Sequence, residues 1–350
     1  MRRRILQITV AMCCLALAVG VGISFRGGAS SPGRSIYQHG YVSERGDVYR
    51  YAVYVPSTRR AGLSAPLVVV LHGCNMTADQ MAAASDFNAS AERHRFIVLY
   101  PDVDASDAGY GRCWKGIWEP AAEGRDRGDA GAIAEMTTAV IARLHVDRSR
   151  VYAIGISAGG FETPILAVDY PDLYAAIGIH SGVAYGGGEA GCLAPSESPS
   201  DANTLAHAAF AAMGAHVRVM PVIVLHGDQD DTIPYRCGQQ TVAQWLGTDN
   251  LILEQERRAL LPLMPTSVSR AAVPGGHAYT VDSYADTAGC VVAQLWTVHG
   301  MGHFWSGGSA ASSSAQFSDP RGPSASAASW AFFSNWRLSG QAHRCARTDH

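Results

Sequence analysis

Short, continuously apolar segments recur along the chain and alternate with segments of helical character. The apolar runs cover residues 67–71, 96–100, 151–156, 175–179, 222–225 and 291–298, and the helical segments cover 78–95, 129–144, 158–168 and 238–246. A strand that is buried on both faces of a sheet is apolar throughout, and strands that alternate with helices form βαβ units. The pattern therefore predicts an α/β fold, with a mostly parallel sheet and helices on both faces.

The composition is that of one large packed domain. The chain has 350 residues, of which 47% are hydrophobic and 16% are charged, which excludes a disordered chain. Tyrosine and valine alternate in residues 48–56, which predicts an exposed edge strand near the beginning of this domain. We predict that the folded domain spans residues 46–338, after a linker at 30–45 and before a polar tail at 339–350.

The charge balance gives no indication of a nucleic-acid partner. Lys and Arg total 27 and Asp and Glu total 30, for a net charge of -3, and no basic stripe is present. Proteins that bind nucleic acids usually carry such a stripe. Nothing in the sequence indicates an oligomeric state.

The N-terminus has the pattern of an export signal. Arg2, Arg3 and Arg4 precede an apolar run that extends from Ile5 to about Phe25. We predict that residues 1–29 are a signal peptide or a retained signal anchor, because the run approaches the ~20 residues that span a bilayer. Either alternative places the protein outside the cytoplasm, secreted or attached to a membrane.

The cysteine count agrees with export. Two of the eight cysteines lie in the apolar N-terminal run, which leaves six: Cys74, Cys113, Cys192, Cys237, Cys290 and Cys345. An even number of cysteines in an exported chain predicts disulfides, although many pairings are possible. No CxxC pair occurs among the six, so a zinc site or a thioredoxin-like motif is not indicated.

A serine motif stands between an apolar strand and a helix. Residues 151–160 read VYAIGISAGG and contain Gly155-Ile156-Ser157-Ala158-Gly159. This is the strand, G-x-S-x-G turn and helix of a nucleophile elbow, in which glycines let the backbone turn sharply and expose the serine hydroxyl. The context makes Ser157 the candidate nucleophile of an α/β-hydrolase fold.

A serine nucleophile needs a histidine base that is oriented by a carboxylate, and both are expected after the serine in this fold. The segment 222–234 (VIVLHGDQDDTIP) ends a strand with three candidate acids, Asp228, Asp230 and Asp231. The segment 296–308 (WTVHGMGHFWSGG) ends a later strand with two candidate bases, His303 and His299.

The developing oxyanion needs hydrogen-bond donors. The backbone N–H of Ala158, which follows the nucleophile, is one candidate. The second is expected after the first buried strand, where the sequence reads Leu71-His72-Gly73-Cys74; the N–H of Cys74 is preferred, with that of Asn75 as the alternative. His72 and His226 each precede a glycine at a strand end and are expected to be structural.

Together these pieces resemble the secreted polyhydroxybutyrate-depolymerase-like esterases, which include feruloyl and acetylxylan esterases. The resemblance covers roughly residues 46 to 337, in order: HGCN (72–75), LYPD (99–102), CW (113–114), RVYAIGISAGG (150–160), YPDLYAA (170–176), HGDQDDTIP (226–234), GMGHFWSGG (300–308) and DPRGPSASAASWAFF (319–333). The resemblance implies an α/β-hydrolase catalytic domain with Asp230 as the acid and His303 as the base. The series is specific for the family but not for the substrate.

The resemblance also carries expectations for the surroundings of the site. Because the family has a cysteine in both the HGC and the CW piece, a Cys74–Cys113 disulfide is implied. We predict Cys237–Cys290 and Cys192–Cys345 for the remaining cysteines. Independently of the resemblance, Trp114 and Trp305 stand near the oxyanion and histidine loops, where we expect them to bind substrate; aromatic residues of the buried core are the alternative. Met76 and the segment 304–306 depart from the family pattern, which puts the substrate preference in doubt.

We therefore expect an exported serine carboxylesterase that uses no metal and no organic cofactor. Its expected partners are short-chain, hydroxyalkanoate-type or aryl esters, as small molecules or oligomers, and activity on crystalline polyester or intact xylan is expected to be poor. Three alternatives remain: a true polyhydroxybutyrate depolymerase, an acyltransferase or serine peptidase on the same fold, and a non-catalytic cell-surface binding protein.

Overall fold

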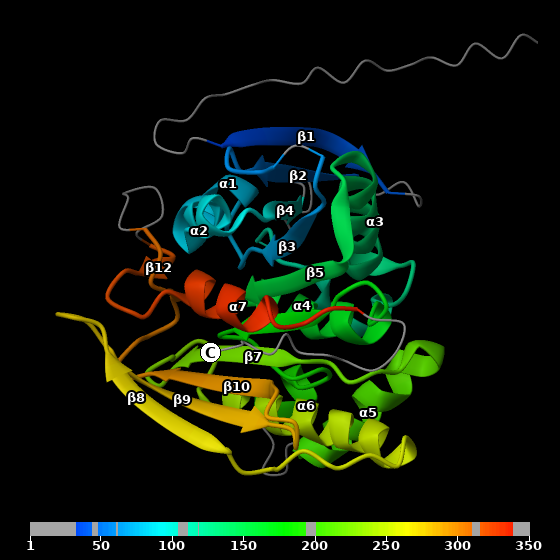
Figure 1. The fold of residues 1–350 in the computed structure, drawn as a ribbon, viewed down its shortest axis with the longest axis vertical. Helices are drawn as coiled ribbons and strands as arrows, with labels where there is room; N and C mark the ends of the chain where they lie inside the picture. Colours follow the sequence, from blue (N-terminus) through cyan, green and yellow to red (C-terminus); the bar gives the residue numbers. More distant parts are fainter. Residues whose placement is uncertain are drawn as a thin grey trace, which may run out of the picture.

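The computed structural model describes residues 33–43, 48–60, 62–103, 111–117, 119–193, 201–309 and 316–338. Within these residues, ten strands form one sheet in the order β1-β2-β4-β3-β5-β6-β7-β10-β9-β8 (Figure 1). Neighbouring strands from β4 to β10 in this order are parallel, and the outer pairs on both sides are antiparallel. The predicted α/β fold with a mostly parallel sheet is confirmed.

The strands of this sheet are β1 (Arg34–Val42), β2 (Val48–Val55), β3 (Ala65–Leu71), β4 (Ile97–Val103), β5 (Val146–Ile156), β6 (Ala176–His180), β7 (Val222–Gly227), β8 (Ser267–Ala272), β9 (Ala278–Ala285) and β10 (Val291–Val298). The α-helices are α1 (Ala78–Ser85), α2 (Phe87–His94), α3 (Gly128–Arg143), α4 (Ala158–Asp169), α5 (Ala202–Met213), α6 (Arg236–Gln255) and α7 (Ala325–Phe333). A short parallel pair, β11 (Trp305–Ser306) and β12 (Ser318–Asp319), lies outside the sheet.

The central strands are buried because helices cover both faces of the sheet. Every residue of β3, β4, β6 and β7 is buried. Helices α3, α4 and α6 pack on one face, and α1, α2 and α7 lie on the other (Figure 1). Continuous apolar sequence is therefore required in these strands, which is why they were recognisable as strands.

The N-terminal edge of the sheet differs from the prediction. The segment 30–45, predicted to be a linker, contains β1, which pairs antiparallel with β2. As a result β2 lies between β1 and β4 and is not an edge strand. The predicted helix at 78–95 is divided at Asp86, which adopts a left-handed conformation (φ 59°) and separates α1 from α2. Strands β8 and β9 and helix α5 were not predicted.

The parallel strands bring the candidate site residues to one edge of the sheet. Strands β3, β5, β7 and β10 point the same way, and each ends just before one candidate segment. These segments are the loop after Leu71, the Ser157 turn, the aspartate loop after Gly227 and the histidine loop after Val298. The carboxyl edge of a parallel sheet is the usual position of a site in α/β folds.

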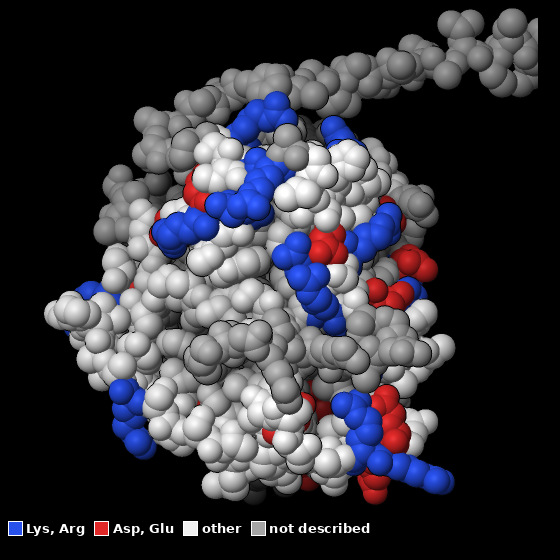
Figure 2. Space-filling model, in the orientation of Figure 1, with Lys and Arg blue, Asp and Glu red and all other residues white. Residues whose placement is uncertain are grey.

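Charged side chains of both signs are present on the face of the molecule that Figure 2 shows. On the face in Figure 2, basic side chains lie in separate groups with acidic ones among them, and no continuous basic stripe is visible. Among the described residues, none of the helices combines the length and apolarity needed to cross a membrane. The predicted signal segment, 1–29, and the tail, 339–350, lie outside the described residues.

Candidate active site

Ser157 occupies a strained turn between β5 and α4. Its backbone has φ 54° and ψ -120°, which is unfavourable for a residue with a side chain. The turn is held from both sides, because the Ser157 N–H donates to the carbonyl of His180 (3.1 Å) and its own carbonyl accepts from Phe161 (3.0 Å). Such strain at a serine is typical of a nucleophile elbow.

The glycines around Ser157 are required by close backbone contacts. A Cβ on Gly155 would lie 2.2 Å from the carbonyl oxygen of Gly159. A Cβ on Gly159 would lie 2.5 Å from the carbonyl oxygen of Leu71, at the end of β3. The G-x-S-x-G pattern therefore allows α4 to begin directly against the neighbouring strand end.

His303 and Asp230 form a hydrogen-bonded pair. Nδ1 of His303 lies 2.8 Å from Oδ2 and 3.0 Å from Oδ1 of Asp230. The carboxylate is fixed further by the backbone N–H groups of Thr232 (3.1 Å) and Ile233 (2.8 Å), both to Oδ1. Burial alone would raise the pKa of Asp230, but the hydrogen bond and charge of His303 and the Ile233 N–H outweigh burial and lower it. Asp230 is thus an ionised acceptor that orients the imidazole.

A second histidine–carboxylate pair accounts for the competing residues. Nδ1 of His299 lies 2.8 Å from Oδ2 of Asp228, and the Gly300 N–H donates to Oδ1 of Asp228 (2.7 Å). This pair is more exposed, with 43% of the His299 side chain accessible against 19% for His303. The structure therefore divides the candidates into two pairs, and Asp231 belongs to neither pair.

His180 links the elbow to the segment that follows His303, and it was not predicted. Its carbonyl accepts the Ser157 N–H, and its Nε2 accepts the N–H of Ser306 (3.0 Å). Burial first, and then the charges of His226 and His303, lower the pKa of His180 to about 3, so its ring is neutral. Since Ser306 and Trp305 follow His303 closely in the chain and contact the His180 ring, the histidine loop lies against the strand end that positions Ser157. The sequence signal was a histidine that directly follows an apolar run.

The loop after β3 lies against the elbow. The Gly73 Cα faces Ser157, since a Cβ built on Gly73 would be 3.3 Å from the Ser157 Cβ. The Asn75 N–H donates to the carbonyl of Gly111 (2.7 Å), which removes it as an oxyanion donor. Within the described residues, the N–H groups of Cys74 and Ala158 have no hydrogen-bond acceptor. The loop geometry thus favours Cys74 over Asn75.

The structure pairs four of the cysteines. Cys74 is bonded to Cys113, as implied by the resemblance, and Cys192 is bonded to Cys237. The predicted Cys237–Cys290 and Cys192–Cys345 bonds are therefore wrong. Cys237 lies in the first turn of α6, where it meets Cys192 in a small buried apolar cluster. Cys290 is also disulfide-bonded, and Cys345 lies outside the described residues.

Removing the Cys74–Cys113 bond should destabilise the protein and impair its activity. The bond closes a loop between residues 39 positions apart, which is worth ~4 kcal/mol in the chain-entropy view. We expect the Cys74→Ser/Cys113→Ser variant to have a lower Tm and a reduced kcat, because the Cys74 loop is no longer fixed beside Ser157. The matched control is Cys192→Ser/Cys237→Ser, which opens a loop of similar length (45 positions). Equal effects of both variants on kcat would contradict a specific role for the first bond.

Trp114 and Trp305, predicted to bind substrate, have no exposed surface. The indole N–H of Trp114 donates to the carbonyl of His72 (2.9 Å), and Trp305 stacks on His180 with ring centroids 4.9 Å apart. Both indoles therefore support the site from the core, and a role in substrate contact is not supported. The exposed aromatic residue of this segment is Phe304, with 36% of its surface accessible.

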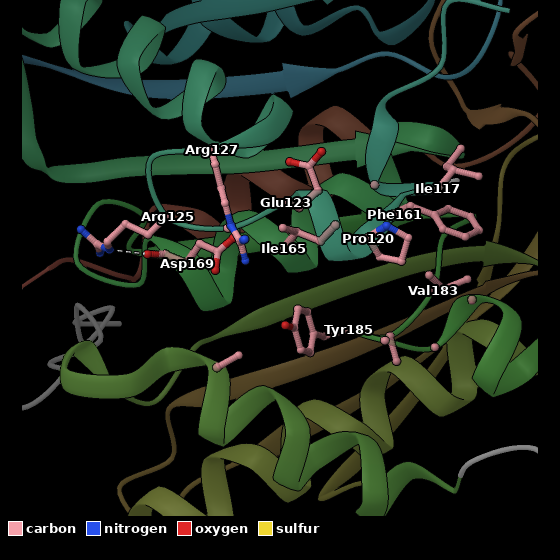
Figure 3. Close-up of a pocket in the computed structure, with 17 residues that line it drawn as sticks. Ile117, Pro120, Glu123, Arg125, Arg127, Phe161, Ile165, Asp169, Val183 and Tyr185 are labelled. Carbon is pink, nitrogen blue, oxygen red and sulfur yellow. Dashed lines mark hydrogen bonds between the residues drawn. The ribbon is translucent and has the colours of Figure 1, made fainter. Parts of the chain in front are cut away.

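A cavity of about 690 Å³ lies between α4 and the segment that follows β6 (Figure 3). Its lining changes from apolar at one end to charged at the other, with Ile117, Phe161 and Val183 at the first end and Arg125, Arg127 and Asp169 at the second. Phe161 is one helical turn beyond Ser157, so the apolar end is the end closer to the candidate nucleophile.

Residues 49–260 match the family model described as esterase PHB depolymerase. Among curated proteins, the chain is 30% identical over 257 residues to poly(3-hydroxyalkanoate) depolymerase C of Paucimonas lemoignei, covering 71% of this chain and 57% of that protein. It is 34% identical over 150 residues to the probable acetylxylan esterase A of Neosartorya fischeri, covering 43% of this chain and 38% of that protein. The match thus spans less than two thirds of the length of either relative.

Solved structures show the same fold. The acetyl xylan esterase from Aspergillus awamori superposes with a TM-score of 0.59, at 24% identity, over 76% of this chain and 93% of that chain. At this level of identity the likeness concerns the fold.

Proposed function

The chain belongs to the esterase PHB depolymerase family, and we propose that it is a serine carboxylesterase with Ser157, His303 and Asp230 as its catalytic triad. The observation that carries the proposal is the arrangement at the carboxyl edge of the sheet. The strained Ser157 elbow follows β5, and at the same edge the Nδ1 of His303 is held 2.8 Å from the buried carboxylate of Asp230. Three separate strand ends supply these residues in the order that a nucleophile, its acid and its base follow in this fold.

The geometry supports a two-step acyl transfer. Nε2 of His303, opposite the Nδ1 that Asp230 holds, takes the hydroxyl proton while Ser157 Oγ attacks the ester carbonyl. The N–H groups of Cys74 and Ala158 stabilise the oxyanion, and the imidazolium then protonates the departing alcohol. Water, activated by the same histidine, hydrolyses the acyl-enzyme and restores Ser157. Apart from the ester and water, every group in this proposed cycle belongs to the chain.

The cavity supports esters with a compact apolar or aryl acyl group. Its apolar end, formed by Ile117, Phe161 and Val183, has the character suited to a short acyl chain or an aromatic ring, and Phe161 lies one helical turn from Ser157, which itself does not line the cavity. The charged end would accept a polar remainder of the substrate. Relatives named for acetylxylan, feruloyl and poly(3-hydroxyalkanoate) esters lie within this chemical range.

The protein acts outside the cytoplasm in this proposal. Disulfides such as Cys74–Cys113 and Cys192–Cys237 persist in oxidising compartments. The arginines and apolar run at residues 1–29 agree with export by a signal peptide or anchor.

Labelling with a fluorophosphonate tests the nucleophile directly. We expect one covalent adduct per chain, and peptide mapping should place it on Ser157, because an activated serine attacks phosphorus and an ordinary serine does not. Denatured protein is the control and should remain unlabelled. A folded protein without an adduct would favour a non-catalytic binding protein on the same scaffold.

A panel of esters tests the substrate class. We expect rapid hydrolysis of p-nitrophenyl acetate and butyrate, methyl ferulate or soluble hydroxybutyrate oligomers, and slow erosion of a polyhydroxybutyrate film at the same enzyme concentration. Rapid erosion of the film with little turnover of the small esters would indicate a true depolymerase. Adding alcohol acceptors and an amide substrate distinguishes an acyltransferase or a peptidase.

A further inference from the structure

Three buried carboxylates meet behind the cavity wall, away from the triad. Glu123, Asp129 and Glu162 each place one carboxylate oxygen within 4.8 Å of the others. The first residue is 4% exposed, and the other two have no exposed surface. They come from the turn before α3, the first turn of α3 and the middle of α4, so their meeting is not visible in the sequence.

Backbone and tyrosine groups account for part of this cluster. Asp129 accepts the Tyr49 hydroxyl (2.7 Å) at Oδ1 and the Lys115 N–H (2.6 Å) at Oδ2. Glu123 accepts the Ala130 N–H (2.9 Å) at Oε2, near the start of α3, where the helix dipole favours an anion. These contacts explain why two acids lie at this helix end.

They do not explain Glu162. Both of its carboxylate oxygens, and Oε1 of Glu123, are buried without a well-formed hydrogen bond among the described residues, and the Gly116 backbone is the one group that acts as a weak partner of Glu162. The Gly116 backbone lies against the Glu162 carboxylate, since a Cβ on Gly116 would be 2.4 Å from Oε2. A buried carboxylate with so few partners is strongly unfavourable unless a cation or a proton neutralises it.

We propose that Glu123, Asp129 and Glu162 bind one hard divalent cation, Ca²⁺ or Mg²⁺. The donors are carboxylate oxygens only, which these ions prefer, and no thiol or imidazole belongs to the cluster to favour a softer metal. The cavity in Figure 3 provides the route of entry, because Glu123 and Gly116 belong to its lining. The ion is independent of the esterase proposal.

The bound ion would join three parts of the fold. Asp129 holds the segment after the Cys74–Cys113 bond through the Lys115 N–H, and Glu162 lies on α4, the helix that begins at the Ser157 elbow. The function is therefore structural stabilisation. The competing explanation is that protons neutralise the cluster, since burial and neighbouring carboxylates raise the pKa of Glu162 well above its usual range and that of Glu123 to about 7.

Ion-dependent unfolding distinguishes the two explanations. The full chain is treated with EDTA and desalted, and its Tm at pH 7.5 is measured with CaCl₂, with MgCl₂, or with NaCl at the same ionic strength. We expect one of the divalent ions to raise the Tm by about 5 °C or more, as for a ligand that binds only the folded state. Titration calorimetry should give one ion per chain, and comparing the two salts identifies the ion. A wild-type Tm that responds to neither salt overturns the proposal in favour of protons.

Glu162→Gln tests the site itself, because it keeps the side-chain size and removes one charge. We expect this variant to lose the ion-induced shift. The matched control is Asp249→Asn at another buried carboxylate, which accepts the Met220 N–H (2.8 Å) and should keep the shift. A full shift in Glu162→Gln overturns the proposal. If that variant does not fold, elemental analysis of gel-filtered wild type decides: about one ion per chain supports the site, and a trace amount overturns it.

Discussion

Ser157→Ala should lose ester turnover almost completely while the fold is retained. In serine hydrolases, removal of the nucleophile typically costs ~10⁶ in kcat, because the histidine and the acid cannot act without it. No hydrogen bond that the structure describes uses the Ser157 hydroxyl, and alanine keeps the Cβ in the same strained turn. We therefore expect the Tm and the circular dichroism spectrum of the variant to equal those of the wild type. Turnover is measured separately, with p-nitrophenyl butyrate as the substrate.

The control for this variant is Ser149→Ala, a serine whose hydroxyl bonds to Asp147 on the same strand, β5, but far from its carboxyl end. It should keep wild-type kcat. If Ser157→Ala keeps activity within tenfold of wild type, Ser157 is not the nucleophile. Contaminating wild-type enzyme is excluded when the variant preparation shows no fluorophosphonate adduct on Ser157.

The parallel strands of the core and the Ser157 elbow were predictable because burial and close backbone contacts restrict which residue types can occupy each position there. Strands such as β3 are buried on both faces, so every position must be apolar. The glycines beside Ser157 are needed where α4 meets the end of β3. In such places the local pattern and the tertiary structure require the same residues.

The edges of the fold were less predictable for the opposite reason. All six residues of β8 are exposed, so its sequence, SVSRAA, needs no alternation of apolar and polar residues. Strand β1 lies in a segment whose composition is that of a linker, and its pairing with β2 is supplied by the backbone. Neither strand has a hydrophobic pattern that a sequence could reveal.

The hydrogen-bond and packing partners of individual side chains were harder to predict, because the order of residues along the chain does not show which side chains meet. The residues alone left Asp228 and Asp230 as competitors, and only the family resemblance favoured Asp230; the structure pairs Asp228 with His299 and Asp230 with His303. The aromatic character of Trp305 suggested a substrate wall, but its ring stacks on His180 in the core. A buried aromatic residue and a cleft aromatic residue have the same sequence signal.

The two histidine–carboxylate pairs provide the second large expected effect, because one is an internal control for the other. Asp230→Asn should lower kcat by ~10⁴, the loss expected when an amide replaces the triad carboxylate and can no longer hold the right tautomer or stabilise the imidazolium. Asp228→Asn makes the same replacement in the more exposed pair, in which Oδ2 of Asp228 lies 2.8 Å from Nδ1 of His299. Its kcat should remain within a few-fold of wild type.

The asparagine variants also separate catalysis from stability. At Asp230, an amide oxygen can still accept the N–H groups of Thr232 and Ile233, so the loop should keep its shape. We expect both variants to unfold cooperatively and to be labelled by fluorophosphonate at very different rates, slow for Asp230→Asn and near wild type for Asp228→Asn. If the ranking is reversed in both kcat and labelling rate, Asp228 and His299 become the acid and the base. If neither variant loses more than tenfold, Ser157 is activated by another group and the proposed triad is wrong.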